Sequence, residues 1–65
     1  MDKEYVARSG RQLAICLKVL YMEGVKETRI EIVEIKSRKL NFRVIYEADQ
    51  ATVDKIENLI NAFTS

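Results

Sequence analysis

Hydrophobic and polar positions follow three patterns along the chain. Residues 13–22 are apolar at nine of their ten positions, with Lys18 as the exception. Residues 28–47 largely alternate between apolar and polar side chains and are rich in β-branched and aromatic types, as strands are. Residues 50–63 carry apolar side chains every three or four positions, as one face of a helix does. The patterns predict a helix, a β-hairpin and a second helix.

The apolar run is bounded by helix start and stop signals. Ser9 and Gln12 match the S-x-x-Q capping box, in which the serine accepts a backbone hydrogen bond and the glutamine reaches back. Gly24 suits the position just after a helix, because glycine adopts a left-handed conformation freely. We therefore expect a helix over residues 10–23. A strand over residues 13–22 is the alternative, although Leu, Ala, Lys and Met favour the helix.

The preceding residues 2–8 fit two interpretations. Tyr5 and Val6 continue the helical register of Leu13 backwards along the chain, and we favour this longer helix, beginning at Lys3. The same residues also fit a short strand or an arm that comes before the helix cap.

The first helix has more hydrophobic surface than one buried face needs. It is apolar around nearly its whole circumference, whereas a surface helix of a small domain has one apolar stripe. A 65-residue chain is near the lower limit for folding without disulfides, metal or association, so it has little material to cover this helix. We expect a partner surface, most simply a second copy of the chain. The extra face would carry Ile15, Val19 and Met22.

Two strands, over residues 28–36 and 40–47, form the predicted hairpin, and the first of them changes phase. Its apolar positions move from one parity to the other between Ile32 and Val33. A β-bulge there would bring all of them to one face of the sheet. Without a bulge, Val33 and Ile35 join Ile45 on the opposite face, and the sheet is apolar on both sides. The second solution requires a cover for that face. These three residues, or pairing along the edge of the hairpin, would therefore complete the predicted homodimer interface.

The last helix is ordinarily amphipathic. Asp49 is a good N-cap for residues 50–63. The apolar stripe of this helix consists of Val53, Ile56, Leu59, Ile60 and Phe63. The predicted fold is a two-layer α+β domain over residues 1–65. Its element order is α-β-β-α, or β-α-β-β-α if the first residues form a strand.

Composition argues against most catalytic and metal chemistry. The chain has no His and one Cys, so the commonest general base is missing, as are an internal disulfide and any ordinary zinc site. Cys16 lies within the apolar run, where we expect a buried and unreactive thiol. No cofactor motif is present, and we expect a non-enzymatic protein.

Basic residues gather around the hairpin turn. Lys36, Arg38, Lys39 and Arg43 occur there without an acidic neighbour, although the net charge of the chain is only +1. A basic β-ribbon could lie along a phosphate backbone, so nucleic-acid binding by residues 36–43 is the alternative function. Edge strands and hairpin tips also carry lysine simply to stay soluble and unpaired.

The expected setting is the cytoplasm. The first residues lack the apolar core of a signal peptide, and ten apolar residues are too few to cross a bilayer, so no membrane partner is expected. Strong strand and helix propensities without Pro or His also agree with a designed chain that has no biochemical activity, while the single Cys and the over-apolar helix look less idealised. The sequence thus predicts a self-associating protein-interaction or structural module.

Overall fold

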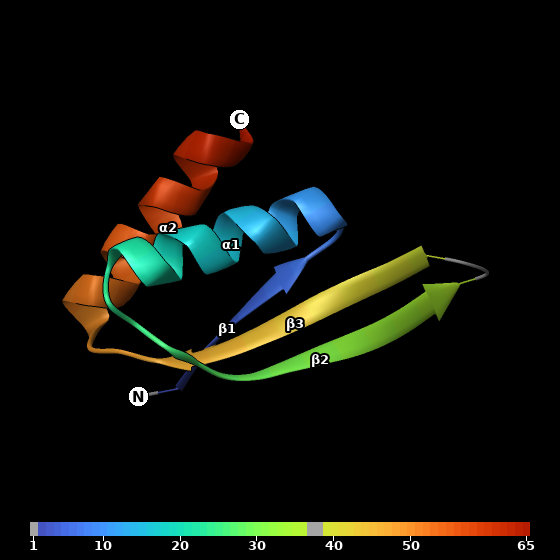
Figure 1. Ribbon diagram of the computed structural model, residues 1–65, viewed down its shortest axis with the longest axis horizontal. Coiled ribbons are helices and arrows are strands. Elements are labelled where there is room, and N and C mark those ends of the chain that lie inside the picture. The colour runs from blue at the N-terminus through green and yellow to red at the C-terminus, as the bar shows by residue number, and fades with distance from the viewer. Residues whose placement is uncertain (1, 37–38) are drawn as a thin grey trace.

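Five elements make up the fold in the computed structural model, which describes residues 2–36 and 39–65, with the side chains of 34–36 excepted. They are β1 (Asp2–Ala7), α1 (Gly10–Met22), β2 (Glu27–Lys36), β3 (Lys39–Glu47) and α2 (Gln50–Thr64). The three strands form one antiparallel sheet in the order β1-β3-β2. Both helices lie on the same side of this sheet, and the β2–β3 hairpin extends beyond them (Figure 1). The chain is therefore a two-layer α+β fold.

The β1 strand replaces the longer first helix that we favoured from the sequence, so that prediction is wrong and the alternative is right. Tyr5 and Ala7 face the helices, opposite Val44 and Phe42 of β3, while Val6 points to the other side. Ala7 is fully buried. Pairing with β3 satisfies one side of the β1 backbone and places alternate side chains, Tyr5 and Ala7, over the core between the sheet and the helices.

Both ends of α1 have the predicted caps. The Gln12 N–H donates to Ser9 Oγ at 3.2 Å, and Gln12 Oε1 accepts from the Arg8 N–H at 2.9 Å, one residue before the cap itself. At the other end, Gly24 has a φ of 70°. The Val25 N–H donates to the Leu20 carbonyl at 2.9 Å, which completes a Schellman motif. The helical interpretation of residues 13–22 is confirmed, and the strand alternative is wrong.

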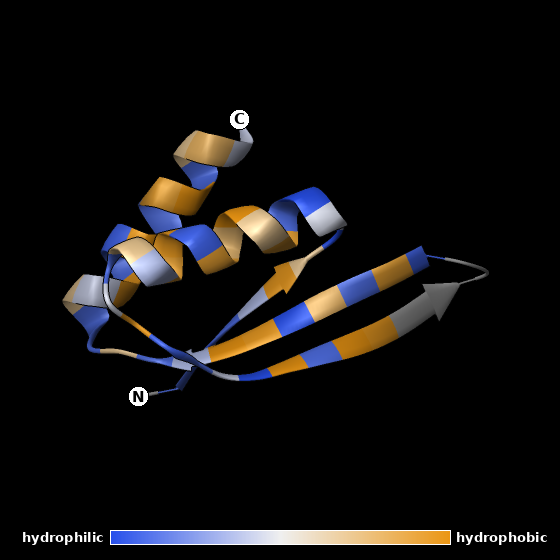
Figure 2. Cartoon of the chain, viewed as in Figure 1, coloured by the Kyte–Doolittle hydropathy of each residue, from blue (hydrophilic) through white to orange (hydrophobic). Residues whose placement is uncertain are grey.

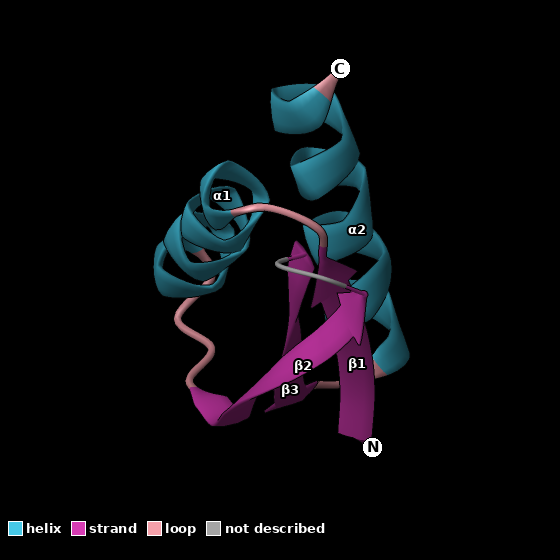
Figure 3. Ribbon diagram, turned by 90° about the vertical axis from the view of Figure 1, so that its right-hand side faces the viewer, coloured by secondary structure: helices cyan, strands magenta, loops and turns pink. Residues whose placement is uncertain are grey.

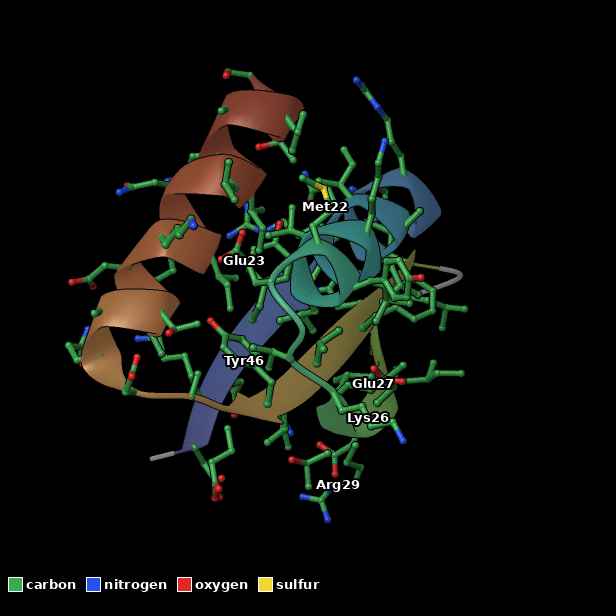
Figure 4. The ribbon with its side chains drawn as sticks, turned by 60° about the vertical axis from the view of Figure 1, so that its left-hand side comes forward. Met22, Glu23, Lys26, Glu27, Arg29 and Tyr46 are labelled. Carbon is green, nitrogen blue, oxygen red and sulfur yellow. The ribbon has the colours of Figure 1, made fainter. Side chains whose placement is uncertain are left out.

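The core lies between the sheet and the two helices. Besides Ala7 of β1, its fully buried side chains come from α1, β3 and α2: Cys16, Val19, Leu20, Val44, Tyr46, Val53, Ile56 and Ile60. Tyr46 points from β3 toward the helices (Figure 4). Asp49 caps α2 as predicted, since its Oδ1 accepts the Thr52 N–H at 2.8 Å. Hydrogen bonding to Thr52 holds the pKa of the Asp49 carboxyl below its ordinary value.

The hairpin has no bulge between Ile32 and Val33. Ile32 pairs with Phe42 and faces the helices, and Val33 pairs with Asn41 on the opposite side, which we call the open face. Register shifts occur instead between Glu27 and Arg29 and between Glu34 and Lys36. The second solution considered from the sequence is therefore the one observed: Val33 and Ile45 share the open face. The turn at residues 37–38 and the side chain of Ile35 lie outside the described residues.

Candidate interaction surfaces

The predicted interface residues of α1 occupy three different environments. Val19 is 0% exposed and belongs to the core of the chain itself, so its predicted place on a partner-facing surface is wrong. Ile15 is half-buried and packs against that core. Met22 is 52% exposed and remains available to a partner. Val19 lies three residues after Cys16 and one residue before Leu20, so helical spacing places all three on one side of α1. That side faces the core.

The two flanks of α1 differ in what covers them. On one flank, Lys18 Nζ lies 5.9 Å from the centroid of the Phe63 ring, so this side faces α2. α2 in turn lies over β1, because Lys3 Nζ of β1 contacts Glu57 Oε2 of α2 at 3.4 Å. Figure 3 shows the two helices side by side above the sheet. The flank of α1 that points away from α2 must therefore face β2, the strand farthest from β1.

An exposed apolar surface lies on this uncovered side. Helical spacing places Leu17 and Tyr21 on the flank of α1 that faces β2. On the sheet, alternate pairing places Ile30, Ile32 and Leu40 on the side of the helices. We call these five residues the β2 flank. Tyr21 is 86% exposed and Ile32 is 67% exposed. Figure 2 shows the hydrophobic segments of the hairpin continuing beyond the part of the sheet that the helices cover.

The β2 flank was not identified from the sequence, although one signal was available. Leu13, Leu17 and Tyr21 follow one another at a spacing of four along α1, which defines a stripe. The apolar side chains around the rest of the helix obscured this stripe. The exposure of Ile30 and Ile32 depends on where the helices sit over the sheet, and no local pattern specifies that position.

The open face of the sheet carries a network of charged side chains across all three strands. Arg43 of β3 donates from one of its terminal guanidinium nitrogens to Glu31 Oε1 of β2 at 2.9 Å, and its Nε lies 3.3 Å from Glu4 Oε1 of β1. The second of these is an ion-pair contact without hydrogen-bond geometry. Arg29 adds a fourth charge, with its Nε 3.2 Å from Glu31 Oε2. Two acidic and two basic groups therefore balance within this network.

This network changes the expectation for the basic hairpin. Arg43 is held by Glu4 and Glu31, so its charge is already matched within the chain. Lys39 is exposed. The Lys36 side chain and the whole of Arg38 lie outside the described residues. The aromatic side chains of the sheet, Tyr5, Phe42 and Tyr46, face the helices, which leaves the described open face without an aromatic platform for stacking bases.

The Val6, Val33 and Ile45 side chains form the apolar part of the open face. Val6 is 42% exposed, and the other two are half-buried. Val6, Val33, Asn41 and Arg43 line a shallow depression there. Apolar and paired charged groups are thus mixed on this face, whereas the five residues of the β2 flank are all apolar.

The described residues bring no reactive group into a site. Burial raises the pKa of the Cys16 thiol to about 11, and the Glu27 carboxylate adds to the rise, so the thiol stays protonated and unreactive near neutral pH. Within residues 2–36 and 39–65, no three His, Cys, Asp or Glu side chains gather as metal ligands would. Over the same part of the chain, every helix is too short or too polar to reach across a bilayer.

Comparison of the chain with protein-family models, with curated proteins and with solved structures found no match in any of the three. The function must therefore be argued from the surfaces described above.

Proposed function

We propose that the protein is a small non-enzymatic module that self-associates as a homodimer and acts through protein contacts. The observation that carries this proposal is the β2 flank, where large apolar side chains from α1, β2 and β3 are exposed on the helix side of the sheet. Exposed apolar surface of this kind marks protein-interaction sites in soluble proteins. Cys16 is a free, buried thiol, and this suits a reducing compartment such as the cytosol.

The expected strength of the association follows from the exposed fractions. Four side chains of the β2 flank are at least 40% exposed, namely Tyr21, Ile30, Ile32 and Leu40. Burying a fully exposed side chain of this kind contributes roughly 1.5–3 kcal/mol. Scaled by the exposed fractions, covering the four side chains would stabilise the dimer by about 4–7 kcal/mol from each copy. Association itself costs about 4–15 kcal/mol in lost translational and rotational freedom. The two contributions are of similar size, so we expect a reversible dimer that depends on protein concentration.

Sedimentation equilibrium tests this proposal directly. Over protein concentrations of about 1 to 200 µM, the average mass should rise from 7.6 kDa toward twice that value. A mass of 7.6 kDa at every concentration would contradict self-association. An average mass that keeps rising with protein concentration, far beyond the mass of a dimer, would contradict a closed two-fold assembly.

Nucleic-acid binding through the hairpin tip is the second candidate, and exposed Lys39 favours it. The pairing of Arg43 with Glu4 and Glu31 counts against it, because a paired guanidinium is less available to phosphate. Fluorescence anisotropy with labelled single-stranded and duplex oligonucleotides separates the two functions. Binding that weakens with salt, and less steeply after Arg38→Ala and Lys39→Ala, would support the nucleic-acid function.

A further inference from the structure

The outer edge of β2 is open. The sheet order β1-β3-β2 makes β2 an edge strand, with β3 on its inner side only. From Arg29 to Glu34 this strand pairs with β3 without a register shift. Residues 29–33 also contain neither Pro nor Lys, the residue types that commonly prevent an edge from pairing with another strand. The regular stretch between the two register shifts can accept a further strand.

We propose that β2 of a second copy pairs antiparallel along this edge, about a two-fold axis that passes through Ile30. This inference rests on the proposed self-association and specifies the surface that makes it. The two sheets would join into one of six strands, in the order β1-β3-β2-β2-β3-β1. In an antiparallel pair, residues directly opposite each other point to the same face of the sheet. Ile30 therefore points to the same face in both copies, and both pairs of helices would lie on that face.

Charge complementarity selects the second copy as the partner. With Ile30 on the axis, Arg29 of each copy stands directly opposite Glu31 of the other, on the open face. The opposite-charge pair forms twice, because the interface is two-fold symmetric. Arg29 and Glu31 already contact each other within one chain at 3.2 Å, so the four side chains would form one neutral cluster. Arg29 is two-thirds exposed and free to turn toward the partner.

The helix side of the same edge supplies apolar contact. Ile30 would meet its symmetry mate on the axis, and Ile32 would lie beside Thr28 of the partner, at the register shift where the regular part of β2 begins. The β2 flanks of the two copies would then adjoin on one side of the combined sheet. Each flank would cover exposed apolar side chains of the other. Figure 4 shows that Arg29 lies on the side of the sheet away from the helices, as the proposed separation of charged and apolar contacts requires.

The other edge, β1, offers less to a partner. On its helix side Ala7 is already buried, Tyr5 is half-buried and Lys3 is bonded to Glu57 of α2. Pairing along β1 would therefore cover little new apolar surface beyond Val6. The contrast provides a control, because Val6 on β1 and Ile32 on β2 are both exposed apolar residues of edge strands, at 42% and 67%.

Light scattering on surface variants tests the location of the interface. Ile32→Glu should shift the protein to the monomer mass at concentrations where the wild type is dimeric, with an unchanged circular dichroism spectrum. Val6→Glu, the control on β1, should leave the dimer mass unchanged. A dimer that persists in Ile32→Glu, or one that is lost in Val6→Glu alone, would overturn the β2 interface while leaving self-association intact. A wild type that is monomeric throughout would instead remove the proposed function.

A charge-swap pair tests the register. Arg29→Glu would place a glutamate opposite Glu31 of the other copy, and Glu31→Arg would place an arginine opposite Arg29 of the other copy. Each variant by itself should therefore dissociate at least tenfold more readily than the wild type. Mixed together, the two variants restore opposite charges at both positions and should form a heterodimer. Failure of the mixture to associate, with both variants folded by circular dichroism, would overturn the pairing centred on Ile30. If Glu31→Arg unfolds through its contact with Arg43, disulfide formation by Ile30→Cys on the axis provides the second test, and absence of the cross-link would overturn the register.

Discussion

Residues of the same chemical type have different roles here because their surroundings differ. Val19 and Tyr21 lie two positions apart on α1, yet Val19 is in the core and Tyr21 is almost fully exposed. Arg43 and Lys39 are both on β3, yet Arg43 is matched by two carboxylates and Lys39 faces solvent. The pattern of the sequence placed Val19 at a partner interface, gave Tyr21 no role, and assigned Arg43 and Lys39 the same role. Helical phase and strand register separate them.

Cys16 links the core to the pH dependence of stability. Its pKa is raised from 9.0 to about 11 by burial and by Glu27, so the folded state holds the thiol proton more tightly than the unfolded chain does. The resulting stability is fully present below about pH 9 and is lost as the pH rises through about 11. Tyr46, whose pKa burial raises to about 12, acts in the same direction.

We therefore expect the free energy of unfolding to decline above about pH 9. In Cys16→Ala the decline should be shallower, although this variant is less stable at neutral pH because its smaller side chain leaves a cavity. Urea unfolding under reducing conditions, repeated across this pH range, measures both curves. Parallel curves for the two proteins would show that the thiol does not contribute to the pH dependence.

The ends of the helices were predictable from sequence because caps are local. Ser9, Gly24 and Asp49 each satisfy backbone groups within a few residues of themselves, and all three have the predicted role. The β1 strand was not predictable in the same way. Its residues follow both a helical and an alternating pattern, and only pairing with β3, about 40 residues later, decides between the two. The register of β2 likewise depends on its partner strand.

The two glycines at the ends of α1, Gly10 at its first position and Gly24 just after its C-cap, give a matched prediction for this element. Gly24 has a positive φ, so Gly24→Ala should destabilise the protein by about 1 kcal/mol through backbone strain alone, since no atom lies within 4 Å of the added Cβ. Gly10 is helical and equally unobstructed, so Gly10→Ala should stabilise the protein by about 0.5–1 kcal/mol. Thermal unfolding of both variants at one protein concentration checks the signs. An equal effect of the two substitutions would contradict the Schellman cap.

At the scale of the whole molecule, the sequence predicted association and offered hairpin edge pairing as one route, but it did not indicate the β2 flank. The excess of apolar residues in α1 and on both sides of the hairpin is visible in the pattern, and both are present in the fold. Of the interface residues predicted from sequence, Val19 is internal, whereas Met22, Val33 and Ile45 keep some exposure. The placement of α2 over β1 leaves the β2 side uncovered, and that placement follows from long-range packing of the helices on the sheet.

The central claim is that two copies join along β2, and isotope-filtered nuclear Overhauser spectroscopy tests it most directly. A sample that mixes labelled and unlabelled chains reports only contacts between copies. We predict cross-peaks between the Ile32 methyl groups of one copy and the Thr28 methyl group of the other, together with contacts at Ile30. The account would be contradicted if, at a concentration where the protein has the mass of a dimer, all intermolecular cross-peaks came from Val6 and Ile45 and none came from β2.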